Sequence, residues 1–337
     1  MTRSLKILPR LPTILLIAAV CSSSRLAWAA ADPAKIVGAE KCAECHKQEY
    51  AAWKETHHYD SFNTMHRTDR AKAIADKMGL QSIKRGSLCL SCHYTEQGSG
   101  GEAVAGVSCE SCHGAAADWM NVHADYGGKD ATRASESAEH KRKRIQQSIA
   151  NGMNRPSLII PTAAQCFRCH NVPEEKLVNV GEHEPGKNFE LVSWLEGEVR
   201  HNFLNSTSNA EDPPGRKRVL YVVGQGLALE TSLRNLSLAT EKATFAVTTA
   251  KRAATATENL KKIDEAVKIP EVETMVAAAD KAELKLNNQA ALNSAADQVG
   301  VAVRKFAATN DGSGLAAVDA LVPDSSHYRG NVYTPQS

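Results

Sequence analysis

The sequence is poor in aromatic residues, in long apolar runs and in excess charge of either sign. Phe, Trp and Tyr make up 5% of the 337 residues, which leaves few rings to fill a large core. The longest apolar run, residues 11–20, is about half of the roughly 20 residues that a transmembrane helix needs. Lys and Arg number 40 and Asp and Glu 38, so the charge balance does not favour nucleic acid as a partner. The sequence thus predicts no transmembrane segment, and any large core must gain its bulk from something other than aromatic side chains.

The N-terminal residues carry the pattern of a secretory signal. Basic side chains precede the apolar run, and Ala27-Trp28-Ala29 places small residues at the spacing of a cleavage site. We therefore predict a signal peptide over residues 1–29, cleaved near Ala29, and export to the periplasm. Cys21 raises the alternative of a lipoprotein, but Val20 before it is larger than the residue usual at that position.

Eight of the nine cysteines form four identical signatures. Each is a Cys-x-x-Cys pair followed at once by His, and the remaining cysteine belongs to the predicted signal peptide. The four signatures are Cys42-Ala-Glu-Cys45-His46, Cys89-Leu-Ser-Cys92-His93, Cys109-Glu-Ser-Cys112-His113 and Cys166-Phe-Arg-Cys169-His170. Eight cysteines in an exported protein would otherwise suggest four disulfides, but a histidine directly after each pair argues against that interpretation.

The chemistry of haem attachment explains this spacing. Two thiols three residues apart can each form a thioether with a haem vinyl group, and the adjacent imidazole then reaches the iron from the proximal side. Zinc sites and thiol–disulfide enzymes also use Cys-x-x-Cys, but neither needs a histidine after every pair. We predict four covalently bound haem c groups with His46, His93, His113 and His170 as proximal iron ligands. Their porphyrins would supply the apolar surface that the chain lacks.

The remaining histidines are candidates for the second axial position on each iron. They are His57, His58, His66, His123, His140, His183, His201 and His327. The adjacent His57 and His58 follow an aromatic residue by about one turn of a predicted helix. His123 follows Trp119 in the same way, and His201 comes after an amphipathic stretch that carries the last tryptophan. These surroundings favour a distal ligand at each of the three places.

Three segments resemble the tetrahaem cytochrome c-554 family in the order and spacing of these residues. They are residues 42–58, 106–123 and 166–201, and the resemblance covers roughly residues 38–205. That family shuttles electrons from hydroxylamine oxidoreductase in ammonia-oxidising bacteria. The resemblance implies two axial histidines on three of the haems and an open, five-coordinate iron on the second.

Carried over by position, the resemblance implies a distal histidine for three haems. His123 would complete the first, His201 the third and His58 the fourth. Helical geometry alone favours His57 over His58, so that choice stays open. The resemblance assigns no second ligand to the haem of His93, for which His183 is a spare candidate. The expected spin states are therefore three low-spin haems and one high-spin haem.

We expect a mainly α protein in two parts. Residues 36–206 are predicted to form a tetrahaem cytochrome domain of short helices and loops packed on haem, because glycines cluster between the signatures. The stretch from Thr207 to Gly215 has the composition of a linker, placed over residues 207–216. An α-helical domain over residues 217–322 and a tail over residues 323–337 complete the chain.

Apolar spacing predicts the helices of the second part. A three–four spacing, interrupted only by Thr240, runs from Leu229 to Ala254 and predicts a helix there. The spacing recurs from Leu292 to Phe306, with Pro270 as a break between the two stretches. This pattern indicates an antiparallel helical hairpin or a small bundle. One interpretation is that one face packs against the haem domain; the alternative is an arm that docks a partner or forms a homo-oligomer. The first is favoured because most amphipathic helices simply pack.

The leading functional hypothesis is an electron carrier whose closely spaced haems pass electrons between redox proteins. The donor expected is a hydroxylamine-oxidoreductase-like or other multihaem enzyme, and the acceptor a quinone-linked or other cytochrome. The alternative is an oxidoreductase that acts on a small nitrogen compound at an open His93 haem. Against it, no signature has Lys in place of His, as the catalytic haem of nitrite reductase cytochromes does.

Overall fold

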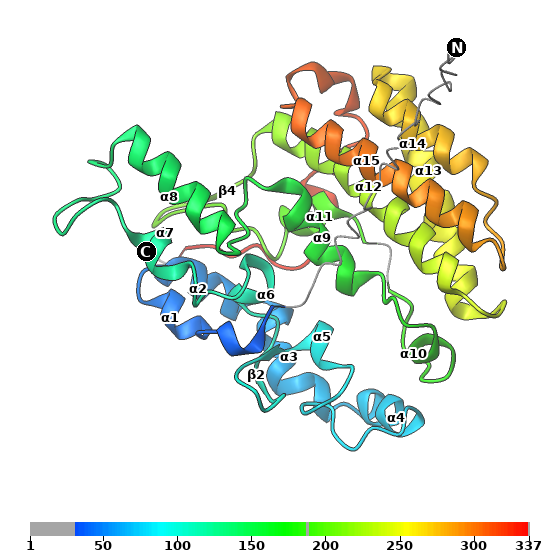
Figure 1. Cartoon of the computed structure of the whole chain (residues 1–337), viewed down its shortest axis with the longest axis horizontal. Coiled ribbons are helices and arrows are strands. Elements are labelled where there is room, and N and C mark those ends of the chain that lie inside the picture. Colours follow the sequence, from blue (N-terminus) through cyan, green and yellow to red (C-terminus); the bar gives the residue numbers. More distant parts are fainter. Residues whose placement is uncertain (1–30, 187–188, 336–337) are drawn as a thin grey trace, which may run out of the picture.

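The computed structural model describes residues 31–186 and 189–335. The described residues are mainly helical, which confirms the predicted fold class. Figure 1 shows a cluster of long helices on one side and a looser arrangement of short helices and loops on the other. The predicted signal peptide of residues 1–29 lies outside the described residues. None of the helices within them is both long and apolar enough to cross a bilayer.

Short helices form the N-terminal part. They are α1 (Ala39–Ala43), α2 (Lys47–Lys54), α3 (His57–Thr64), α4 (Asp69–Lys77), α5 (Leu90–His93), α6 (Cys109–His113), α7 (Met120–Ala124), α8 (Ala138–Ala150), α9 (Ile159–His170), α10 (Glu175–Asn179) and α11 (Leu191–Leu195). Two 3₁₀ turns, η1 (Pro33–Lys35) and η2 (Met65–Arg67), accompany them. Several of these helices begin at a side-chain cap, for example Thr56 before α3 and Thr68 before α4.

Two small antiparallel hairpins interrupt the helices. One pairs β1 (Thr95–Glu96) with β2 (Ala103–Ala105) between the second and third signatures. The other pairs β3 (Phe203–Leu204) with β4 (Asn209–Ala210). The segment expected to be a linker, residues 207–216, thus holds a strand and also the start of the next helix, which begins at Pro214.

Four longer helices form a bundle. They are α12 (Pro214–Leu238), α13 (Thr244–Val267), α14 (Pro270–Lys281) and α15 (Gln289–Thr309), followed by the 3₁₀ turns η3 (Ser313–Val318) and η4 (Ser325–His327). A proline stands in the first turn of both α12 and α14, where its missing N–H costs no helical hydrogen bond. The predicted segment from Leu292 to Phe306 lies inside α15.

The single helix predicted from Leu229 to Ala254 is wrong, because the chain turns between α12 and α13. The reason is a tertiary contact that periodicity does not reveal. The carboxylate of Glu175 accepts hydrogen bonds from the backbone N–H groups of Thr240 and Glu241, at 3.0 and 3.3 Å. These donors are then satisfied outside a helix, so the chain can reverse here without leaving them unpaired.

Apolar burial is concentrated in and around the bundle. One continuous cluster includes Phe245, Met275 and Phe306 of the bundle and extends to Phe167 on α9 and Leu191 on α11. Helix α12 is buried on all sides over residues 219–230, because it packs against α9 and α11 as well as against α13 and α15. The bundle therefore packs against the segment that carries the fourth signature.

Residues 31–160 contain little apolar core. Their buried apolar side chains are mostly Ala, and the larger ones are Ile36, Leu90, Tyr94 and Trp119. The small cluster there consists of Leu90, Tyr94 and Ala103 with a few partly buried neighbours. A stretch of this length ordinarily buries far more, so its packing fits a chain that folds around apolar groups other than its own side chains.

The bundle core gives a first prediction, a matched pair of variants on α15. Replacing Phe306, which is fully buried, by Ala should lower the free energy of unfolding by about 3–5 kcal/mol, because it leaves a cavity. Replacing Val301 on the same helix, 70% exposed, should change it by less than about 0.5 kcal/mol. Urea unfolding followed by far-ultraviolet circular dichroism measures both. Equal losses for the two variants would contradict the packing described for α15.

Candidate haem-binding site

Each of the four signatures lies on a helical turn. The second and third occupy α5 and α6, the fourth ends α9, and the first runs from α1 to the start of α2. The amide of His46 donates to the carbonyl of Cys42 at 2.8 Å, and that of His93 to Cys89 at 3.1 Å. Such a turn brings residues i, i+3 and i+4 to one face, so both thiols and the imidazole can approach one flat group.

Each signature histidine faces a second histidine from a distant part of the chain. The ring centres are 5.9 Å apart for His46 and His123, 6.2 Å for His93 and His183, 6.1 Å for His113 and His201, and 6.3 Å for His58 and His170. The second members come from α7, from the loop after α10, from the segment before β3 and from α3. The four pairs include the three distal histidines that the resemblance implies, His58, His123 and His201, and also the spare candidate His183.

This separation fits an iron between the two rings. Imidazole binds transition metals at about 2.0 Å, and its ring centre lies about 1.2 Å beyond the nitrogen, which places two trans ring centres about 6.4 Å apart. All four separations agree with that value to within about half an ångström. In addition, the Nδ1 atom of His123 is buried without a hydrogen-bond partner among the described residues, an arrangement that suits a ring whose partner is a bound metal.

The structure distinguishes the neighbouring His57 and His58. His58 faces His170, and burial lowers its pKa. The side chain of His57 is 88% exposed and its Nδ1 atom lies 3.0 Å from the buried carboxylate of Glu198. The backbone of Gly106 packs directly against the start of α3. A Cβ atom at position 106 would collide with the carbonyl oxygen of His58, so only glycine fits here. The amide of Val107 then donates to that carbonyl at 3.1 Å.

Backbone carbonyls orient several of the imidazoles. The Nδ1 atoms of His113, His183 and His201 lie 3.0, 2.6 and 2.7 Å from the carbonyl oxygens of Asn154, Glu184 and Val199 respectively. A carbonyl can only accept, so Nδ1 carries the proton in each ring and Nε2 keeps its lone pair. That tautomer is the one in which an imidazole presents Nε2 to a metal.

Burial keeps three of the four signature histidines neutral. It lowers the pKa of each of them to about 4, and the facing imidazole adds to the effect; these are His93, His113 and His170. An imidazole must be unprotonated at the coordinating nitrogen to bind iron. At neutral pH these rings are therefore ready to act as ligands.

Cysteines of different signatures lie next to one another, and none of the eight forms a disulfide. A hydrogen-bonding contact with Cys109 lowers the pKa of Cys42, and a contact with Cys169 lowers the pKa of Cys92 to about 6. Burial raises the pKa of Cys166 to about 12, and the nearby thiol of Cys112 adds to it. The first site thus adjoins the third, the third adjoins the fourth, and the fourth adjoins the second.

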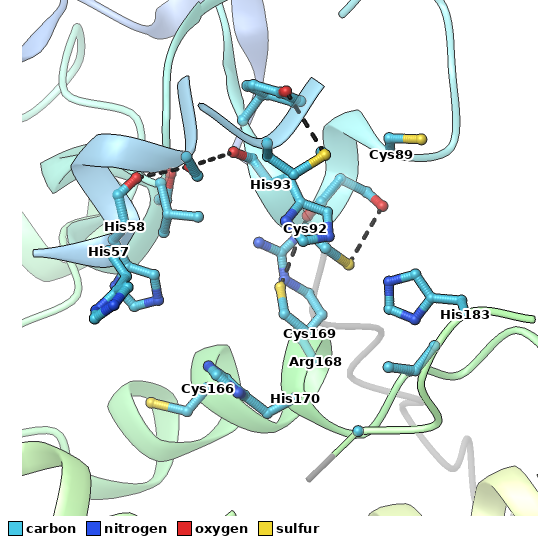
Figure 2. A pocket seen from close by; sticks show the side chains of 18 of the residues that line it. His57, His58, Cys89, Cys92, His93, Cys166, Arg168, Cys169, His170 and His183 are labelled. Carbon is cyan, nitrogen blue, oxygen red and sulfur yellow. Dashed lines mark hydrogen bonds between the residues drawn. The ribbon is translucent and has the colours of Figure 1, made fainter. Parts of the chain in front are cut away.

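The second and fourth sites share one cavity of about 860 Å³. Figure 2 shows Cys89, Cys92, Cys166 and Cys169 on its walls, with His58 and His183 on opposite sides. Pockets for single small ligands span about 300–1,000 Å³, so this one is at the large end of the range. Apolar residues including Ile74, Leu177 and Phe189 complete the lining. Its size and lining suit large apolar groups that carry a metal ion within reach of the histidines.

Sequence reasoning missed one residue that holds the site together, Glu110. It lies between the two cysteines of the third signature and is 1% exposed. Its carboxylate accepts hydrogen bonds from the amides of Val37, Gly38 and Ala116, at 2.8–3.2 Å. These contacts tie the segment before the first signature to the third. A glutamate at a variable position of the motif carries no pattern that predicts this role.

Comparisons with known proteins agree with the resemblance inferred from the sequence. Residues 41–114, which contain the first three signatures, match the family described as cytochrome c554 and c-prime. The chain is also 29% identical over 101 residues to cytochrome c-554 of Nitrosomonas europaea, over 27% of this chain and 43% of the relative. The chain thus spans less than half the length of that relative. No solved structure matches it.

The matched segment is similar to the c-type cytochromes that this family name describes. For that segment, the similarity implies covalently bound haem c as the cofactor. The fourth signature, at Cys166, lies beyond the matched residues 41–114. Its assignment depends on the motif and on the geometry around His170 and His58.

Glu110 gives a prediction for the site. Both carboxylate oxygens of Glu110 accept hydrogen bonds from backbone N–H groups. In Glu110→Gln the side-chain NH₂ replaces one of these oxygens and faces an N–H group that it cannot accept from. We expect a loss of about 1–3 kcal/mol in the free energy of unfolding, measured by urea titration. Glu44→Gln, at an exposed glutamate of the first signature, serves as the matched control and should have little effect. A loss no greater than that of the control would contradict the bridging role of Glu110.

Proposed function

We propose that this protein is a periplasmic tetrahaem c-type cytochrome that carries electrons between redox partners. The observation that carries the proposal is the set of four imidazole pairs, each with one ring directly after a Cys-x-x-Cys turn. A single such pair could arise by chance packing of two histidines. Four pairs of nearly equal separation, at all four signatures, are what four haem sites require.

In this proposal the eight signature cysteines attach the four haems and the histidines bind iron. Proximal ligands are His46, His93, His113 and His170, and distal ligands for the first, third and fourth haems are His123, His201 and His58. The haems supply one-electron redox chemistry when bound. The chain contributes the axial ligands, their hydrogen bonds and the burial that together set each potential.

The contacts between signatures support a route through the protein. The sites adjoin in the order first, third, fourth, second, through Cys42 with Cys109, Cys112 with Cys166, and Cys92 with Cys169. Electrons would then enter and leave near the two ends, at the first and second sites.

We also propose the domain organisation inferred from the sequence. Residues 1–29 would be removed on export, and residues 36–206 would form the haem-bearing part. The helices after Pro214 pack through α12 against α9 and α11, which supports a scaffolding role for the bundle. Hydrogen bonds from Arg329 to Ser193 and from Glu198 to Arg329 bring the tail back to the haem-bearing part (Figure 1).

The partners proposed are redox proteins. The relative in Nitrosomonas europaea is itself named a cytochrome. A multihaem enzyme of the hydroxylamine oxidoreductase kind fits as donor, and a quinone-linked or other cytochrome fits as acceptor. Oxidation or reduction of a small nitrogen compound at the His93 haem is the competing function, and the position of His183 opposite His93 counts against it.

A potentiometric titration with a mass measurement tests the electron-carrier proposal. The mass of the purified protein should correspond to four attached haems on a chain that begins near Ala30, and the titration should show four one-electron steps. Double substitution of Cys89 and Cys92 by Ala should remove one haem and one step. Steady turnover of nitrite, hydroxylamine or nitric oxide by the purified protein, or fewer than four haems in it, would overturn the proposal.

Substitution of the two neighbouring histidines on α3 tests the distal assignment. His58→Ala should convert one haem from low spin to high spin, because it removes the ring that faces His170. His57→Ala should leave all spin states unchanged, since that ring is exposed and contacts Glu198. Electron paramagnetic resonance of the oxidised variants measures the difference. If only the His57→Ala variant gained a high-spin haem, His57 rather than His58 would be the distal ligand.

A further inference from the structure

We propose that His183 is the second axial ligand of the His93 haem, so that no iron in this protein is open to a small molecule. The inference rests on the proposed function, because it concerns the same haem sites. It differs from the expectation drawn from the family resemblance, which leaves the second iron five-coordinate.

The geometry of the His93–His183 pair is the first argument. Its ring centres are 6.2 Å apart, inside the range of 5.9–6.3 Å covered by the other three pairs. Its interplanar angle of 54° also lies within the spread of the others, 16–74°. Nothing in this geometry sets the second site apart from the three that already have an assigned distal histidine. Figure 2 shows both rings beside the shared cavity.

The orientation of the His183 ring is the second argument. Its Nδ1 lies 2.6 Å from the carbonyl oxygen of Glu184, so Nδ1–H donates there and Nε2 stays unprotonated. His201, the distal candidate of the third site, makes the same kind of contact with Val199 at 2.7 Å. Hydrogen bonding of Nδ1 to a carbonyl is the usual way in which a protein orients a histidine that binds metal through Nε2.

The loop that carries His183 is held in place on both sides of it. The amide of His183 donates to the carbonyl of Leu177 at 3.1 Å, which folds the loop back on α10. Glu182 pairs with Lys77 at 2.5 Å, and Glu184 pairs with Arg70 at 3.6 Å. Both cations lie on α4, so the two exposed ion pairs straddle His183 and orient it, although each alone contributes little stability.

The backbone conformation of Glu182 also shows that the loop before His183 is constrained. Its φ is +55°, in the left-handed region that a residue with a side chain rarely adopts. The preceding Gly181 lies against the side chain of Met78 and the carbonyl of Leu177, where a Cβ would collide. The chain therefore makes a tight turn directly before His183, and this turn brings the ring to the cavity wall.

Spin state and ligand binding test the inference in the full-length haem-loaded protein. The oxidised protein should show only low-spin haem by electron paramagnetic resonance, and the reduced protein should bind no carbon monoxide. His183→Ala should produce one high-spin haem and one equivalent of bound carbon monoxide. His327→Ala, which removes an exposed histidine that contacts Asp324, is the matched control and should change neither readout.

A second variant keeps the test decisive if His183→Ala folds poorly. His183→Met supplies a thioether ligand at the same place, so the haem should stay low spin while one of the four potentials rises. A high-spin haem in the unmodified protein, or four low-spin haems in His183→Ala, would overturn the inference. Either result leaves the electron-carrier proposal intact provided that the mass shows four haems, whereas fewer than four haems would defeat that proposal instead.

Discussion

The structure depends on one geometric requirement, that two imidazole rings face each other about 6 Å apart at each signature. Local structure supplies only half of each pair, because a Cys-x-x-Cys-His turn fixes the proximal ring relative to its two thiols. The other ring must be brought from a distant segment. His123, His183 and His201 each lie far along the chain from the proximal ring they face. Each pair is therefore also a long-range tertiary contact, and the four pairs bring distant segments of the chain together around the proposed haem sites.

This requirement accounts for the uneven distribution of apolar residues. Residues 31–160 bury mainly Ala, whereas the helices from Pro214 onward contain an ordinary close-packed core with Phe245 and Phe306 at its centre. A segment that wraps cofactors needs small side chains and tight turns, since the cofactor fills the space. The fourth signature lies where the two kinds of packing meet. Phe167, between its cysteines, belongs to the large apolar cluster, so α9 connects the haem sites with the bundle.

Local sequence patterns predicted the features that depend on neighbouring residues. They did not predict the features that depend on contacts between distant parts of the chain. The four signatures, the helical character and the segment within α15 follow from spacing alone. The turn between α12 and α13 does not, because the hydrogen bonds that its amides make go to Glu175 in another part of the chain. The distinction between His57 and His58 likewise depends on Glu198, which is far away in sequence. Glu110 occupies a variable position of its motif, so its bridging hydrogen bonds leave no trace in the pattern.

The second site shows why ligand assignment by resemblance has a physical limit. A matched motif transfers the residues that it contains, but a distal ligand comes from a separate segment, and at the second site that segment is a loop that is free to differ. Here the loop after α10 turns sharply at Glu182 and is paired with α4 on both sides of His183. An iron with an imidazole on each face keeps the same ligands in both oxidation states and has no position for a substrate. Closing the second site in this way would make all four positions alike in ligand type. Differences between their potentials would then arise from burial and from hydrogen bonds to the rings, such as those that His113, His183 and His201 make to backbone carbonyls.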